Sequence, residues 1–150
     1  MRCFQLSDAK GDVFGADDDA LAHSVSEDLV MGKGIALDFR TRFGGVDDLT
    51  AQKIPIGGVG VLERNSNVPN RGSTVIYYLV TKKQFWGKPT LRTLESSLVA
   101  MREDCLARGI RTIAMPRIGC GLDRLRWIDV QALIIKVFAN TTIKISAYHL

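Results

Sequence analysis

The sequence predicts an α/β sandwich in which helices cover a mixed β-sheet. Residues 74–80 (TVIYYLV) are rich in β-branched and aromatic side chains without polar alternation, which is typical of a central strand buried on both faces. Residues 90–108 carry apolar side chains at i, i+3, i+7, i+10 and i+14 from Leu91, the spacing of one helical face. Strand-like and helix-like segments alternate along the rest of the chain, as they do in α/β domains.

The other elements follow from local pattern and from the glycines and prolines that break it. Further strands are predicted over residues 3–6, as an edge strand, and over residues 20–25, 60–64, 112–115 and 143–148. Further helices are predicted over residues 34–43, 46–52 and 127–138. Gly44 and Gly45 end the first of these helices, as C-cap glycines do. Residues 65–73 and 116–126 are predicted to be loops.

Composition limits the class of protein. The chain has 150 residues, of which 46% are hydrophobic and 24% charged, so we expect a single domain over residues 1–150. The net charge of +4 suits a phosphate-bearing ligand, but no basic run marks a nucleic-acid footprint. Three cysteines at unpaired spacing predict a reducing compartment. No secretory leader, membrane span or metal cluster is predicted, so we expect a nuclear or cytoplasmic protein without a metal or other cofactor.

Two glycine-containing loops are suited to phosphate. The first, MGKGI from Met31 to Ile35, leads directly into a predicted helix, whose unpaired N–H groups and dipole favour an anion. The second, PRIGCGLD from Pro116 to Asp123, lies between a predicted strand and a predicted helix. Neither loop matches a P-loop or the GxGxxG dinucleotide pattern, so these residues predict a phosphate-bearing ligand without naming it.

Several stretches, taken in order, resemble the macrodomain family. They are KGDVF from Lys10, SED from Ser26, MGKGIALDFRTRFGG from Met31, YYLVTKK from Tyr77, KPT from Lys88 and MPRIGCGLDRLRW from Met115. Within the family the chain is most similar to the terminal ADP-ribose protein glycohydrolases, which remove mono-ADP-ribose from acidic side chains. The resemblance covers residues 10–150 and implies a three-layer α/β/α macrodomain with a mixed sheet of six strands.

The resemblance also implies roles for individual residues. Lys82 and Asp123 would be the catalytic pair, with the lysine attacking C1″ of the distal ribose and the aspartate helping to resolve the lysyl intermediate. Asp12 would accept a hydrogen bond from the adenine amine. The implied ADP-ribose ligands are Asp12, Val13, Ser26, Met31, Gly32, Lys33, Gly34, Ile35, Pro116, Arg117, Ile118, Gly119, Cys120, Gly121, Leu122 and Leu150.

Residue chemistry alone leaves simpler readings open for the same positions. Lys82 could be a surface lysine at a strand end, and Asp123 a turn or helix-cap aspartate. Asp12 could equally be a turn aspartate after a glycine. The aromatic pair Phe85 and Trp86 either shapes the acceptor side of the cleft or packs on the following helix.

Four activities remain open at this level. The first is hydrolysis of ADP-ribosyl groups from glutamate or aspartate of modified proteins, with O-acetyl-ADP-ribose as a further candidate substrate. The second is an ADP-ribose reader without catalysis, although a reader needs neither Lys82 nor Asp123. The third is hydrolysis of ADP-ribosylated DNA, and the fourth a phosphatase acting on ADP-ribose 1″-phosphate. The partners expected are ADP-ribose and ADP-ribosylated proteins, with a monomeric chain and no membrane.

Overall fold

The computed structural model describes residues 3–66, 72–121 and 123–150. Six strands form one sheet in the order β1-β6-β5-β2-β4-β3. All neighbouring pairs are parallel except β3 with β4, so the sheet is mixed, as predicted. The strands are β1 (Gln5–Lys10), β2 (Ala20–Ser26), β3 (Val59–Asn65), β4 (Ser73–Lys82), β5 (Thr112–Pro116) and β6 (Lys144–His149).

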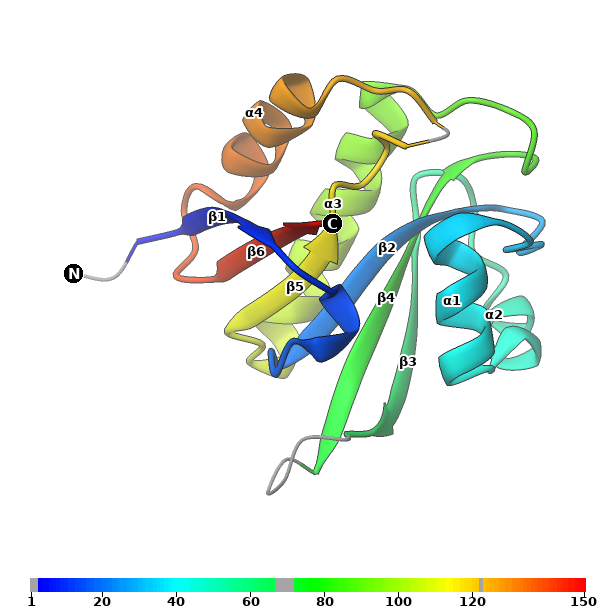
Figure 1. Ribbon diagram of the computed structural model, residues 1–150, viewed down its shortest axis with the longest axis horizontal. Coiled ribbons are helices and arrows are strands. Elements are labelled where there is room, and N and C mark those ends of the chain that lie inside the picture. The colour runs from blue at the N-terminus through cyan, green and yellow to red at the C-terminus, as the bar shows by residue number, and fades with distance from the viewer. Residues whose placement is uncertain (1–2, 67–71, 122) are drawn as a thin grey trace.

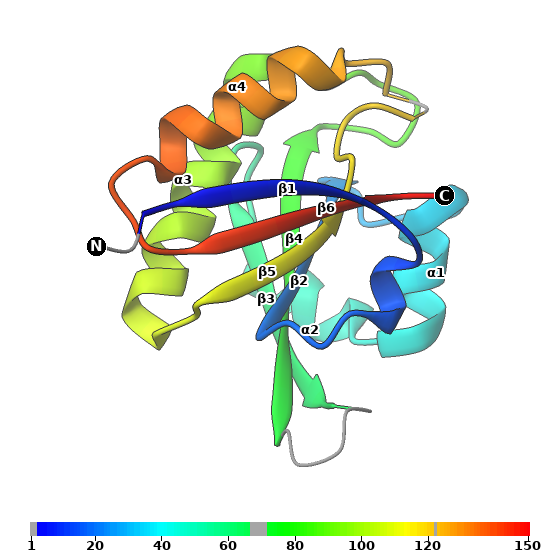
Figure 2. The ribbon, with the colours of Figure 1, turned by 60° about the vertical axis from the view of Figure 1, so that its left-hand side comes forward.

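Helices cover both faces of the sheet (Figure 1). Two long helices, α3 (Leu91–Arg108) and α4 (Trp127–Phe138), lie together on one face. The other face carries the 3₁₀ helix η1 (Val13–Gly15), α1 (Gly34–Phe43) and α2 (Val46–Gln52). Figure 2 shows the two groups on opposite sides of the sheet. The predicted three-layer sandwich is therefore confirmed, and none of the described helices is long and apolar enough to cross a membrane.

Strand β4 joins the two halves of the core. Its side chains alternate, with Tyr77 and Leu79 packing toward α3 and α4, and Tyr78 and Val80 packing toward η1, α1 and α2. Every residue from 75 to 80 is buried. A strand with two buried faces needs the uninterrupted apolar run seen in the sequence, which explains why this element could be predicted so well.

Strand β1 differs most from its predicted bounds, and β4 ends two residues later than predicted, whereas the other strands agree to within one residue at each end. The edge strand was expected over residues 3–6 but runs from Gln5 to Lys10, in parallel register with β6. Its polar residues are compatible with a strand because it has only one neighbour and most of its side chains are exposed. Strand β4 continues past Val80 to Lys82, whose carbonyl accepts a hydrogen bond from the Glu27 N–H at 2.8 Å. Lys82 is thus the last residue of a central strand.

Glycines and a threonine cap set the ends of the helices that flank the site. Gly44 and Gly45 follow α1 with φ of 60° and 74°, as predicted for C-cap glycines. Thr90 caps α3 through a reciprocal pair of hydrogen bonds with Thr93. Gly109, with φ of 74°, ends α3. These caps fix where the loops between strands and helices begin and end.

Candidate active site

Five parallel strands end at the same edge of the sheet, and the predicted site residues lie in the segments that follow them. The carboxyl edge of a parallel sheet is where ligands bind in open α/β folds. The relevant segments are those after β1, β2, β4 and β5, together with the C-terminal residue after β6. The fold therefore gathers at one edge residues that span almost the whole chain.

Lys82 and Asp123 are in contact at this edge. The Nζ of Lys82 lies 2.5 Å from Oδ1 of Asp123, and the two side chains are 13% and 15% exposed. Lys82 ends β4, whereas Asp123 lies in the loop after β5, and β2 runs between those two strands. The pair therefore reaches across the carboxyl end of β2, which is Ser26. The two residues are partly shielded from solvent yet accessible, which is compatible with the roles predicted for them.

Asp28 connects the segments on either side of this pair. Its Oδ1 accepts hydrogen bonds from the Ser26 hydroxyl and, at 3.3 Å, from the Val30 N–H. Its Oδ2 accepts from the Phe85 N–H at 2.9 Å, in the loop that follows Lys82. Burial alone would raise the pKa of Asp28, but these hydrogen bonds and the Lys82 charge hold it below its usual range. Asp28 is thus a carboxylate that ties the β2–α1 loop to the β4–α3 loop.

Sequence reasoning missed this role of Asp28. The residue lies in the SED stretch that resembles the family, but its main long-range partner is a backbone N–H 57 positions further along the chain. A backbone donor leaves no side-chain pattern in the sequence. Only the tertiary fold could have shown this contact.

The β2–α1 segment, which contains the first glycine loop, holds two non-glycine residues in the left-handed region. Leu29 and Met31 have φ of 55° and 44°, a conformation that costs about 1 kcal/mol or more for L residues. Both side chains are buried in the core on the α1 side, and this packing holds the backbone in place. Gly32, Lys33, Gly34 and Ile35 are exposed at the start of α1, where Lys33 makes no side-chain cap. The loop thus presents exposed backbone at a helix N-terminus on a fixed base.

The second glycine loop is closed by its own backbone. The Leu125 N–H donates to the Gly119 carbonyl at 2.7 Å, and the Arg124 N–H donates to the Gly121 carbonyl at 3.2 Å. Gly119 has φ of 76°, and a Cβ there would lie 2.8 Å from the Leu125 side chain. Ile118 and Gly119 are buried, whereas Gly121 is exposed. Leu122 lies outside the described residues. The positive φ favours glycine at position 119, and a Cβ there would also require the Leu125 side chain to shift.

Arg117 and Cys120 have their side chains occupied within the protein. The Arg117 guanidinium lies 2.5 Å from Asp8 and stacks over the Trp127 ring at 5.6 Å. The Cys120 thiol contacts the Ile118 carbonyl at 3.4 Å, and burial raises its pKa. Any contact from these two positions to a ligand would therefore come first from the backbone. Pro116, the last residue of β5, precedes them.

The predicted adenine end lies beside η1. Asp12 accepts a hydrogen bond from the Phe14 N–H at 3.0 Å and caps η1. Asp12 is therefore a turn aspartate, which was the simpler interpretation of the sequence. The residue is nevertheless exposed, so its carboxylate remains accessible to a ligand. Val13 is buried, and Leu150 is 96% exposed after β6. The Arg42 guanidinium lies 4.3 Å from the centre of the Phe14 ring.

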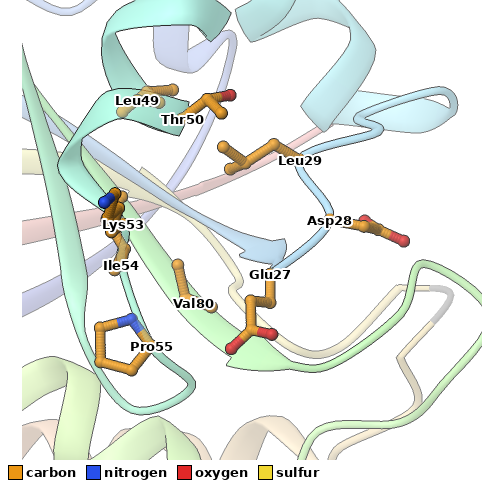
Figure 3. Close-up of a pocket in the computed structure, with 9 residues that line it drawn as sticks. All are labelled: Glu27, Asp28, Leu29, Leu49, Thr50, Lys53, Ile54, Pro55 and Val80. Carbon is orange, nitrogen blue, oxygen red and sulfur yellow. The ribbon is translucent and has the colours of Figure 1, made fainter.

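A cavity of about 390 Å³ adjoins the site on its α2 side. Figure 3 shows it between the β2–α1 segment and the end of α2, with Leu29 and Glu27 turned toward it and the Asp28 carboxylate turned away. None of the predicted ADP-ribose ligands lines this cavity. Asp28 therefore stands between the cavity and the loop that carries Phe85. Among the described residues, no three His, Cys, Asp or Glu side chains cluster as a metal site would require.

The sheet edge, two glycine loops and a lysine–aspartate pair together define an α/β domain built to hold a phosphate-bearing ligand beside reactive groups. The chain belongs to the macrodomain family, since the family model described as Macro domain matches residues 22–134. It is 47% identical to human ADP-ribose glycohydrolase OARD1 over 97% of this chain and 92% of that protein.

More distant relatives support the same assignment. The chain is 27% identical to the DNA ADP-ribosyl glycohydrolase of Mycobacterium tuberculosis, over 85% of this chain and 37% of that protein. Among solved structures, Thermosipho africanus DarTG in complex with ADP-ribose matches with a TM-score of 0.84 and 27% identity. That match covers 96% of this chain and 41% of the other. The predicted family and fold are therefore confirmed.

Proposed function

We propose that this chain is an ADP-ribose glycohydrolase that releases ADP-ribose from glutamate or aspartate of modified proteins. The observation that carries the proposal is the Lys82–Asp123 contact of 2.5 Å at the carboxyl edge of the sheet. Similarity to a human protein named ADP-ribose glycohydrolase, at 47% identity, supports the activity. A reader without catalysis would need neither side chain.

The ligand would lie over the carboxyl ends of β2, β5 and β6. Asp12 would accept from the adenine amine, and the backbone N–H groups of the two glycine loops would receive the diphosphate. Ser26, at the end of β2, would meet the distal ribose through its hydroxyl, which donates to Asp28 in this structure. These assignments follow from position and donor type. Together they would bring C1″ of the distal ribose toward Lys82.

The chemistry proceeds in two displacements. Lysine reacts as the free amine, and Asp123 takes the proton that Nζ gives up as it attacks C1″. The new N–C1″ bond replaces the C1″–O bond, whose electron pair leaves with the acceptor carboxylate. The protonated Asp123 then returns its proton to the lysyl nitrogen, and the resulting carboxylate takes a proton from the water that attacks C1″ as the Lys82 amine leaves. Release of that last proton to solvent regenerates the enzyme. The products are free ADP-ribose and an unmodified carboxylate.

The experiment is release of ADP-ribose from a protein modified on glutamate. We expect release by the natural chain and loss of at least about a hundred-fold in Lys82→Ala and in Asp123→Ala. Lys144→Ala, an exposed lysine at the opposite edge of the sheet, is the matched control and should behave as the natural chain does. Unchanged release in Lys82→Ala would refute the mechanism, and binding of ADP-ribose without any release would favour the reader.

Hydrolysis of ADP-ribosylated DNA is the second candidate. The similarity to proteins named DNA ADP-ribosyl glycohydrolase, and the net charge of +4, favour it. The same assay with ADP-ribosylated single-stranded DNA, run beside the protein substrate, decides between the two. A kcat/KM higher on DNA than on protein would make DNA the preferred acceptor.

A further inference from the structure

An exposed aromatic pair lies directly beyond the catalytic lysine. Phe85 and Trp86 are 51% and 67% exposed, although side chains of this size are usually covered. Their rings meet edge to face, with centres 5.0 Å apart and planes at 88°. They follow Lys82 by three and four residues, in the loop that Asp28 anchors next to the proposed active site. More than half of each side chain is therefore open to solvent, so the pair is not buried beneath the following helix.

The backbone that carries the pair is fixed. Asp28 accepts a hydrogen bond from the Phe85 N–H at 2.9 Å, and the Gly87 N–H closes a turn onto the Gln84 carbonyl at 2.9 Å. Beyond the turn, Pro89 is buried and Thr90 caps α3. The rings are therefore presented on an ordered loop. Aromatic side chains presented this way are typical of the energetically important residues in protein interfaces.

Positive charge lies near the same site. Lys83 is exposed next to Lys82, and Arg124 is exposed next to Asp123. Figures 1 and 2 both show the β4–α3 and β5–α4 loops lying beside each other at one edge of the sheet. An exposed cation therefore adjoins each member of the reacting pair in the chain. An acceptor segment rich in glutamate or aspartate would meet complementary charge here.

We propose that Phe85 and Trp86, with Lys83 and Arg124 beside them, form an acceptor-binding surface for an acidic polypeptide segment around the modified carboxylate. This inference rests on the proposed function, since it names the acceptor that the same site receives. The perpendicular rings make an apolar corner suited to one side chain of that segment. Single-stranded nucleic acid instead stacks successive bases on aromatic faces, which two perpendicular rings serve poorly.

The test measures binding in the Lys82→Ala background, where the substrate survives. The probe is a glutamate-ADP-ribosylated acidic peptide, compared with free ADP-ribose. We expect the peptide to bind about ten-fold more tightly than free ADP-ribose, and Phe85→Ala/Trp86→Ala to remove that advantage while leaving the Kd for free ADP-ribose within two-fold. The matched control, Leu106→Ala/Ile135→Ala, deletes two exposed apolar side chains on α3 and α4 and should change neither Kd.

Each other outcome overturns the inference. An equal Kd for the peptide in the aromatic variant and its parent would mean that the rings do not touch the acceptor. A parallel loss of affinity for free ADP-ribose would place them in the ADP-ribose cleft. Loss of affinity for ADP-ribosylated single-stranded DNA with peptide binding unchanged would make the surface a nucleic-acid site.

Failure of the proposed function is a separate result. It would appear as absence of release by the natural chain, measured in the assay above, whereas the binding advantage of the peptide does not depend on turnover. Lys83→Glu tests the role of charge. It should lower the affinity for the acidic peptide more than the affinity for a peptide whose flanking residues are neutral. An equal loss of affinity for the two peptides would show that the surface does not select an acidic segment.

Discussion

The Nζ of Lys82 and Oδ1 of Asp123 lie 2.5 Å apart, although 41 residues separate them in the chain. The contact crosses the end of β2 because that strand runs between β4 and β5. Ser26 therefore lies at the end of β2, under the pair, and Asp28 follows it by two residues. The order of the strands explains why residues from three separate segments meet at this point.

The Asp28 carboxylate should hold the loop that carries Phe85 in place for turnover. Asp28→Ala removes an acceptor shared by Ser26, Val30 and Phe85, so we expect kcat/KM for release of ADP-ribose to fall about ten-fold. Asp28→Asn keeps an acceptor oxygen and should recover part of that loss. Asp38→Ala, an exposed aspartate on α1, is the control. Equal activity of Asp28→Ala and Asp38→Ala would exclude the role.

Replacement of Gly119 should cost more stability than replacement of the nearby Gly121. Alanine at position 119 meets both the positive φ of 76° and a contact of 2.8 Å with Leu125, and should lower the free energy of unfolding by about 1–2 kcal/mol. Gly121 has ordinary φ and open space around its Cβ position, so Gly121→Ala should change stability by less than about 0.5 kcal/mol. Chemical denaturation measures both, and a reversed order would contradict this account of the loop.

Two adjacent buried tyrosines should respond oppositely to loss of the hydroxyl. The Tyr77 hydroxyl donates to Asp104 at 2.6 Å, so Tyr77→Phe should cost about 1–2 kcal/mol of unfolding free energy. The Tyr78 hydroxyl is buried without a hydrogen-bond partner among the described residues, so Tyr78→Phe should be neutral or stabilising. Thermal or chemical unfolding of both variants measures these changes in the free energy of unfolding. Similar losses in both variants would show that the Tyr78 hydroxyl is satisfied.

Buried His23 should make the fold sensitive to acid. Its ring stacks on Phe39 at 3.9 Å and is fully buried, and this burial lowers its pKa to about 3. The unfolded chain, with a histidine pKa of about 6.5, binds the proton more readily. Stability is therefore fully present above pH 6.5 and is lost as pH falls toward 3, by at most about 1.4 kcal/mol per pH unit.

His23→Leu isolates this effect from that of the carboxylates. The difference in unfolding free energy between the natural chain and His23→Leu should shift in favour of the variant as pH falls from 7 to 4.5. A difference that stays constant over this range would mean that His23 has the same pKa in the folded and the unfolded chain, as an exposed histidine would.

An element was predicted well where the pattern of its own residues determines its structure, and poorly where its structure depends on residues far away in the chain. The long apolar run of β4 and the periodic face of α3 carry their structure in their own residues, and both were predicted closely. Strand β1 was misplaced because its polar residues pair only through their backbone with β6, which follows it by more than 130 residues. The same reason hid Asp28, whose key partner is the backbone of Phe85.

The same distinction applies to the candidate site, where some features could be predicted from local motifs and others depend on the fold. The glycine loops and the motif around Asp123 were visible as patterns, so their residues could be named in advance. The contact between Lys82 and Asp123 could not be predicted from residue chemistry, because it depends on the strand order. The engagement of Arg117 with Asp8, on a different strand, was equally invisible. Tertiary geometry supplied the side-chain pairings, and sequence supplied the candidates.

The most direct test of the central claim is to look for the covalent intermediate on Lys82. Asp123→Ala should slow its hydrolysis, so incubation of that variant with glutamate-ADP-ribosylated protein followed by mass spectrometry should find one ADP-ribosyl group on Lys82. The same treatment of Lys82→Ala/Asp123→Ala should leave the chain unmodified. ADP-ribose released at the natural rate by Lys82→Ala, with no adduct on Lys82 in Asp123→Ala, would contradict the account.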